Sequence, residues 1–257
     1  MGGVVVVKLG GGLITHKDKL CTVNTDVLES LAKQLSKSSK RLVIIHGAGS
    51  FGHLKAREYR LAEGDVEGLN QSEAIESVRA DMIELNSHVT SVLKEYGMNC
   101  ESFPPHQWVN GIGPDFSGDL PYCEGTTVVF GDVVDDPVQK FGILSGDDLI
   151  VRYAIENPDV ERVVFAIGGV DGILRVPPAD ATPDDLIEIW SPDIEFKGEH
   201  VAAIDVTGGI GLKAQRGSMI AKHGIDVMIV NGEHPTRLLD AIEGKPVRGT
   251  RIIHPVG

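Results

Sequence analysis

The sequence predicts an α/β fold built on a mainly parallel sheet. Two observations support this prediction: short apolar runs alternate with helical patterns, and the clearest of these runs end at glycine-rich turns. A continuous run of Val and Ile is typical of a strand that is buried on both faces, as in a parallel sheet covered by helices. Strands and helices in repeated alternation are the pattern of an α/β protein.

Four of the apolar runs are predicted strands, and each leads into its own turn. They are Val4–Leu9 before Gly10, Leu42–His46 before Gly47, Val163–Ile167 before Gly168, and Val227–Val230 before Asn231. After the first of them, Asn24 or Thr25 is the expected cap of a helix that continues to Leu35. The longest helical pattern runs from about Gln71 to Tyr96, with apolar residues at steps of three or four and Gly97 as its stop.

Length and composition limit the class of protein. The 257 residues are 42% apolar and carry 24 basic and 37 acidic side chains, a net charge of −13. The chain is expected to form a single domain over residues 1–257, with two lobes on one continuous sheet, about 1–140 and about 141–257, as an open alternative. The segment Val176 to Lys197, rich in proline and acids, is expected to be an excursion or flap between the later strands.

The same numbers indicate the partners and the compartment. A strongly acidic balance argues against nucleic acid as a partner, because binding to a phosphate backbone needs a positive face. No apolar run approaches the roughly 18 to 20 residues of a membrane span, so no membrane partner is expected. Three cysteines without a CxxC pair favour a reducing compartment, and we expect a cytoplasmic protein.

The glycine turns predict a site for anionic oxygens. Glycine lets a phosphate approach the backbone closely, and N–H groups at the carboxyl end of parallel strands bind phosphate well. The turn from Gly47 to Gly52 reads GAGSFG and matches GxGxxG. Alone, this motif is consistent with a dinucleotide site, a mononucleotide or phosphate site, or a merely structural turn. It is not a Walker A loop, because His53 stands where that loop requires lysine.

Three lysines beside the glycine turns favour phosphoryl transfer. Lys8 precedes the first turn, Lys17 follows it, and Lys213 follows a later glycine-rich stretch. Fixed cations that converge on one point would stabilise the charge of a moving phosphoryl group. The alternative for each lysine is a solvated surface position, which is least expected for Lys8 at the end of a buried strand.

Histidines and aspartates near the turns are further candidates. His53 is expected to face whatever binds at the second turn, whereas His46 is either a ligand contact or a satisfied core residue. Asp147 and Asp171 also follow turns, where an aspartate contacts ribose, magnesium or a lysine, or equally caps the next helix. No HxxxH or HExxH pair indicates a metal site, and no metal-ligating residue is predicted.

Five segments, in their order and spacing, resemble the amino acid kinase superfamily. They are Lys8–Gly12, His46–His53, Leu144–Leu149, Gly168–Leu174 and Asp205–Lys213. The block HGAGSFGH is most similar to the isopentenyl phosphate kinase family within it. The resemblance implies an open αβα sandwich with a mainly parallel sheet, a homodimer, and ATP with Mg²⁺ as cofactors. It also implies phosphorylation of isopentenyl phosphate to isopentenyl diphosphate in mevalonate-route isoprene biosynthesis.

The resemblance further implies roles for single residues. The catalytic residues would be Lys8, Lys17 and His53. The residues that bind ATP would be Lys8, Gly10, Gly11, Gly12, Gly49, Asp171, Gly172, Gly209 and Lys213. The residues that bind the small phosphorylated substrate would be Gly47, Ala48, Gly49, His53 and Gly146. The first lobe would then serve the acceptor and the second lobe the nucleotide.

The apolar tail of that acceptor needs a slot, and other functions stay open. Candidates for the slot are Phe51, Ile75, Val78, Met82 and Ile83, although most of this stripe is expected to be core. A related kinase with another small acceptor, such as fosfomycin or an amino-acid carboxylate, is the nearest alternative. A non-catalytic nucleotide-binding protein on the same fold and a nicotinamide oxidoreductase are the others.

Overall fold

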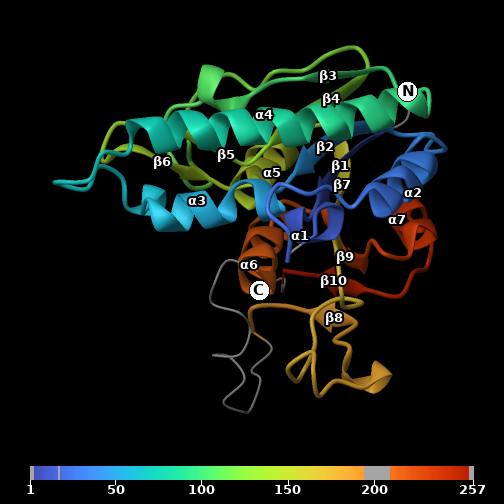
Figure 1. The fold of residues 1–257 in the computed structure, drawn as a ribbon. Coiled ribbons are helices and arrows are strands. Elements are labelled where there is room, and N and C mark those ends of the chain that lie inside the picture. Colours follow the sequence, from blue (N-terminus) through green and yellow to red (C-terminus); the bar gives the residue numbers. More distant parts are fainter. Residues whose placement is uncertain (1–2, 17, 194–208, 255–257) are drawn as a thin grey trace.

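A mainly parallel sheet of eight strands forms the centre of the molecule (Figure 1), as the sequence predicts. The computed structural model describes residues 3–16, 18–193 and 209–254. The strands lie in the order β3 (Cys100–Ser102), β4 (Thr126–Phe130), β2 (Arg41–His46), β1 (Val4–Leu9), β7 (Val160–Ile167), β9 (Asp226–Asn231), β10 (Thr250–Ile252) and β8 (Ile189–Trp190). The strands from β3 to β9 are parallel to one another, and β10 runs antiparallel to β9.

Strand β1 lies inside the sheet and is buried on both faces. Its side chains alternate between two apolar cores, because successive residues of a strand point to opposite faces. Val5, Val7 and Leu9 belong to one core, and Val4 and Val6 to the other. This alternation puts residue 8, a lysine, on the same face as Val4 and Val6.

Helices cover both faces of the sheet, which completes the expected αβα sandwich (Figure 1). One core is filled by α2 (Thr25–Leu35), α4 (Ser72–Glu95) and α7 (Pro235–Ile242). The other core is filled by α5 (Gly146–Ile155) and α6 (Ile210–Ala221). The predicted long helix is confirmed as α4, and Gly97 ends it with a φ of +82°. Asn24 occupies the N-cap of α2 without a side-chain hydrogen bond.

Short elements after β1, β2, β3 and β4 shape the carboxyl edge of the sheet. They are α1 (Gly11–Ile14), η1 (Gly49–Phe51), α3 (His53–Glu58), η2 (Leu61–Glu63), η3 (Pro105–Gln107) and the antiparallel hairpin β5 (Asp132–Asp136) with β6 (Lys140–Leu144). The expected excursion lies between β7 and β9, as far as residue 193. It contains η4 (Pro183–Asp185) and the edge strand β8, and residues 194–197 lie outside the described part of the chain.

Strands from both halves of the chain join in the one sheet. β1 pairs with β2 on one side and with β7 on the other, and their paired residues end at the same edge. Among the helices that the structure describes, none combines the length and the apolar composition needed to cross a membrane.

Candidate active site

The turns that follow β1, β2 and β7 surround a single pocket of about 740 Å³ at the carboxyl edge of the sheet. The chain leaves β1 toward β2, while β7 lies on the other side, and such a point is where open α/β sheets bind ligands. Most of the predicted site residues line this pocket: Lys8, Gly10, Gly11, Gly12, Gly47, Ala48, Gly49, His53, Gly146, Gly172, Gly209 and Lys213. Lys17 lies outside the described residues, and its predicted role stays a prediction.

The first two glycine turns are packed directly against each other. A Cβ atom on Gly11 would lie 2.2 Å from the backbone nitrogen of Gly49. Gly49 has a φ of +51°, and its own Cβ would lie 2.1 Å from Thr15 Oγ1. The Thr15 hydroxyl ties the turns together, because it donates to Gly11 O and accepts from the N–H of Ser50. Glycine is therefore required here by the close approach of two backbones.

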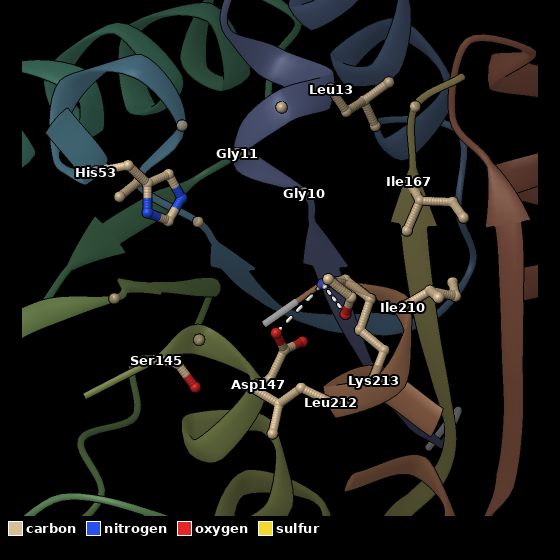
Figure 2. Close-up of a pocket in the computed structure, with 18 of the residues that line it drawn as sticks. Gly10, Gly11, Leu13, His53, Ser145, Asp147, Ile167, Ile210, Leu212 and Lys213 are labelled. Carbon is tan, nitrogen blue, oxygen red and sulfur yellow. Dashed lines mark hydrogen bonds and ion pairs between the residues drawn. The ribbon is translucent and has the colours of Figure 1, made fainter. Parts of the chain in front are cut away.

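A buried aspartate joins two lysines on the floor of the pocket (Figure 2). Lys8 Nζ lies 2.5 Å from Asp147 Oδ1, and Lys213 Nζ lies 3.2 Å from Asp147 Oδ2. Lys8 comes from the face of β1 that α5 covers, Asp147 is in the first turn of α5, and Lys213 is in the first turn of α6. The side chains of Lys8 and Asp147 are only 5% and 4% exposed.

The contact between Lys8 and Asp147 is close in distance but poorly aligned. Among the residues that the structure describes, Asp147 Oδ1 has no partner that meets the angles of a hydrogen bond. The contact is an ion pair, because in a buried site the charge attraction persists even at a poor angle. The ammonium group of Lys8 is therefore held near Asp147 without being fully hydrogen-bonded to it.

Burial and neighbouring charges set the protonation states of this cluster. Loss of solvent lowers the pKa of Lys8 to about 8; Asp147 partly offsets this effect and Lys213 adds to it. Burial alone would raise the pKa of Asp147, but the charges of Lys8 and Lys213 outweigh it and lower that pKa. At neutral pH the lysine is mainly protonated and the aspartate ionised. Two ammonium groups facing one carboxylate leave the floor of the pocket positively charged, which suits an anionic ligand.

The structure decides between the two interpretations that the sequence left open for Asp147. The helix cap is Ser145, whose Oγ accepts from the N–H of Asp148 at 3.1 Å. Asp147 is therefore free to contact the lysines. Sequence reasoning did not include it among the site residues, although one signal pointed to it: a lysine buried on a central strand needs an anionic partner.

His53 is the first residue of α3 and lines the other end of the pocket (Figure 2). Its ring is exposed, yet its pKa is lowered by partial loss of solvent and then by the positive charges of Lys8, Arg57 and Lys213. The pKa therefore lies below the usual value of about 6.5. The ring is mainly neutral at pH 7 and carries one N–H that can donate to an anionic oxygen.

The end of the pocket near His53 is apolar. Its apolar side chains are Leu54, Ala56, Val78, Met82, Val133 and Ile143. Of the five slot candidates, Val78 and Met82 line the pocket. The other three do not: Phe51 is fully buried in the core, Ile75 packs against that core, and Ile83 is 44% exposed. The helical spacing places four of the candidates on α4, and Phe51 is a candidate because it is close to His53 in the sequence. Only the packing of α3 and β5 against α4 selects Val78 and Met82.

Asp171 does not line the pocket, although its neighbours Val170 and Gly172 do. Its carboxylate accepts from Arg237 at 2.5 Å, Arg248 at 2.6 Å and Asn231 at 3.3 Å. Burial alone would raise the pKa of Asp171, but hydrogen bonds from these groups, with Arg248 the strongest, lower it. This network supports the segment whose residues Val170 and Gly172 line the pocket. A contact of Asp171 with the nucleotide remains a prediction.

The histidine at the end of β2, His46, is a core residue. His46 is fully buried and lies outside the pocket lining: its ring nitrogens face Gly47 O at 3.2 Å and Asn86 Oδ1 at 3.3 Å. Burial lowers the pKa of His46 to about 4, so it is a neutral core residue.

Arg175 lines the pocket wall that follows β7. Sequence reasoning missed this residue, because no motif distinguishes an exposed arginine in a loop.

Comparisons with known proteins agree with this geometry. The family model described as "Amino acid kinase family" matches residues 3–231. Isopentenyl phosphate kinase from Methanothermobacter thermautotrophicus is 33% identical, over 97% of this chain and 98% of that protein. The enzyme of the same name from Thermoplasma acidophilum is also 33% identical, over 92% and 95%. A crystal structure titled "X-ray structures of isopentenyl phosphate kinase" superposes with a TM-score of 0.83 at 30% identity, covering 97% of this chain and 99% of that one.

The packed glycine turns generate a prediction about stability. Gly49→Ala should destabilise the protein by about 2 to 4 kcal/mol, because the new Cβ meets both Thr15 Oγ1 and a backbone oxygen of Gly11 in addition to the strain of a positive φ. Gly68→Ala is the matched control: Gly68 has a φ of +80° but nothing within 4 Å, so it should lose only about 1 kcal/mol. Urea unfolding measures both variants, and equal losses would contradict the close packing.

Proposed function

The chain belongs to the amino acid kinase family, and on that premise we propose that it transfers the γ-phosphoryl group of ATP to isopentenyl phosphate. An oxygen of the acceptor phosphate forms a bond to the γ-phosphorus while the bond from that phosphorus to the bridging oxygen of ADP breaks. The products are isopentenyl diphosphate and ADP. One observation above all supports this: a pair of lysines bridged by a buried aspartate lies between an apolar end and a wall of glycine turns.

The chemistry needs cations more than it needs a base. The second pKa of a phosphate monoester is about 6, so the acceptor is mainly a dianion at neutral pH and is already a nucleophile. The obstacle is repulsion between two anions. We propose that Lys8 and Lys213, with the backbone N–H groups of the glycine turns, offset that repulsion and align the attack. Lys17 is expected to add a further cation.

The two ends of the pocket suggest where each substrate lies. On the acceptor side, His53 would donate to the phosphate, and Gly47, Ala48, Gly49 and Gly146 would approach it closely. Gly146 leaves room for Lys8, since a Cβ there would lie 3.1 Å from Lys8 Cε. On the nucleotide side, the pocket wall is formed by residues from the segments 168–170, 172–178 and 209–213. The division into an acceptor lobe of residues 1–140 and a nucleotide lobe of residues 141–257 stays a prediction, because Ile143 and Gly146 of the second half lie on the proposed acceptor side.

The apolar end near His53 is the proposed slot for the five-carbon tail. Val78 and Met82 of α4 and Ile143 of β6 all line it. Burial of the tail in such a slot stabilises the bound acceptor by about 25 cal/mol for each Å² of apolar surface removed from water. A carboxylate acceptor such as glutamate carries a charged ammonium group where this slot offers apolar carbon. The slot therefore favours a phosphate with a hydrocarbon tail.

Magnesium is proposed to arrive with the nucleotide. Within residues 3–16, 18–193 and 209–254, no three His, Cys, Asp or Glu side chains are gathered into a cation site. Among the described residues, the carboxylates that line the pocket are engaged: Asp147 with the lysines, and Asp132 with His106 at 2.6 Å. The described part of the pocket lining therefore does not form a resident metal site. In kinase sites Mg²⁺ usually keeps several waters and is held by substrate phosphates with one or two carboxylates rather than by a cage of protein ligands, and we assign no protein ligand to it.

The remaining expectations go beyond the pocket. A homodimer, a cytoplasmic location and a place in the mevalonate route stay predictions, as do the contacts that single residues make with ATP.

A comparison of acceptors distinguishes the proposed kinase from the alternative functions. Purified protein with ATP and magnesium should release ADP with isopentenyl phosphate, and much less with fosfomycin, with glutamate or with no acceptor. Absence of ADP release with every acceptor would indicate a non-catalytic nucleotide-binding protein, and reduction of a nicotinamide cofactor would indicate an oxidoreductase.

His53→Ala should weaken use of the acceptor rather than of ATP. A hydrogen bond to a charged group contributes about 1.5 to 3 kcal/mol, so the KM for isopentenyl phosphate should rise by roughly 10- to 100-fold. The KM for ATP should stay within about twofold. The control is His88→Ala, an exposed histidine of α4 that does not line the pocket. Steady-state kinetics with each substrate varied in turn measure the effect, and an unchanged acceptor KM would exclude the proposed contact.

The lowered pKa of Lys8 predicts how nucleotide affinity depends on pH. The pKa of about 8 means that Lys8 is charged below pH 8 and neutral above it. The affinity for MgATP should therefore be constant from about pH 7 to 8 and then fall, approaching tenfold for each further pH unit. Lys8→Met should bind more weakly at neutral pH and show no break near pH 8. Calorimetric titration across this range measures it, and a break that persists in Lys8→Met would assign the titration to another group.

A further inference from the structure

The first turn of α5 carries two adjacent aspartates that point to different partners. Asp147 contacts the two lysines of the pocket floor, whereas Asp148 contacts Arg216 of α6. Arg216 Nε and Nη2 both lie 2.8 Å from Asp148 Oδ1, and the two side chains are only 15% and 8% exposed. Neither Arg216 nor Asp148 lines the pocket. This second ion pair is not used by the phosphoryl-transfer chemistry described so far.

Asp148 is itself held rigidly. Its N–H donates to Ser145 Oγ at 3.1 Å, and its Oδ2 accepts from the same hydroxyl at 2.7 Å. Its backbone and side chain are thus both tied to the residue that caps α5. A carboxylate fixed in this way is a firm anchor for a partner on another helix.

Arg216 follows Lys213 by three residues on α6, so the two side chains leave the helix on the same side. The first two turns of α6 are thereby joined to the first turn of α5 by two ion pairs: Lys213 with Asp147 at the pocket, and Arg216 with Asp148 outside its lining. The N-cap of α6, Gly209, offers no side-chain hydrogen bond. The first turn of α6 therefore depends more on contacts with α5 than the first turn of a capped helix would.

We propose that Arg216 is a positioning residue that fixes Lys213 above the floor of the pocket through its ion pair with Asp148. The inference rests on the proposed function, because it assumes that Lys213 contacts the phosphates of ATP. A long lysine side chain has many rotamers, and a displacement of about 1 Å can lower a rate by roughly 100-fold. Arg216 does not reach the pocket, so its effect must pass through the placement of α6 and Lys213.

A merely structural ion pair would also lower stability when broken, so the test needs readouts beyond folding. Arg216→Gln should raise the KM for ATP by about tenfold and leave the KM for isopentenyl phosphate within about twofold. It should also move the alkaline break in nucleotide affinity to higher pH, because the charge of Lys213 lowers the pKa of Lys8 and a displaced Lys213 would lower it less.

The matched control is Arg162→Gln. Arg162 Nε lies 2.8 Å from Asp226 Oδ2 and its side chain is 17% exposed, close to the values for Arg216, but it lies outside the pocket lining. This variant should lose stability while both KM values and the alkaline break stay in place. Arg216→Lys keeps the charge and should retain most of the ATP affinity. If Arg216→Gln does not fold, Asp148→Asn weakens the same ion pair from α5 and should raise the KM for ATP in the same way.

A double-mutant comparison identifies the route of the effect. The dissociation constant for MgATP is measured for Arg216→Gln alone and together with Lys213→Ala. If Arg216 acts through Lys213, the roughly tenfold loss of affinity should shrink to less than twofold in the Lys213→Ala background. An equal loss in both backgrounds, or unchanged ATP parameters in Arg216→Gln, would overturn the inference. Normal ATP binding and turnover in Lys213→Ala would instead remove its premise, the proposed role of Lys213.

Discussion

The carboxylate of Asp147, buried between the ammonium groups of Lys8 and Lys213, is the interaction on which the rest of the site depends. Two cations this close would repel each other strongly in a medium of low dielectric constant, and a buried lysine without a partner would lose its proton. One carboxylate between them keeps both lysines in place and still leaves an excess positive charge. A pocket for two anions needs both conditions: cations that remain charged before the ligand arrives, and a net charge that attracts it.

The fold supplies this arrangement through register. Lys8 occupies a position of β1 whose side chain faces α5 and α6, because alternate residues of a strand share a face. The first turns of these two helices then bring Asp147 and Lys213 to it from above the sheet edge. Behind that contact, the ion pair of Asp148 with Arg216 links the first turn of α5 to the second turn of α6. The positioning role proposed for Arg216 would make this pocket depend on an ion pair outside its lining as well as on the residues that would touch substrate.

The glycine turns and the apolar end have complementary tasks. The turns after β1 and β2 approach so closely that a single Cβ would collide with the neighbouring backbone, and this packing brings two sets of N–H groups to one edge. The apolar end, formed by α3, α4 and the β5–β6 hairpin, lies beside His53. A phosphate joined to a short hydrocarbon tail matches both surfaces at once, whereas a charged amino acid matches only the first.

Several features of this protein could be predicted from the sequence because they depend on local patterns. Apolar runs that end in glycine indicate strands of a parallel sheet, the three- and four-residue spacing indicates α4, and a lysine on a buried strand indicates a charged group at the pocket. Other features depend on contacts between residues far apart in the chain, which no local pattern encodes. Only the tertiary structure shows that Asp147 binds lysines and Ser145 caps the helix, that Asp171 faces Arg237 and Arg248 behind the pocket wall, and that Val78 and Met82 reach the pocket while Ile83 faces away from it. In each case the residue's type admitted two environments, and the packing of distant elements selected one.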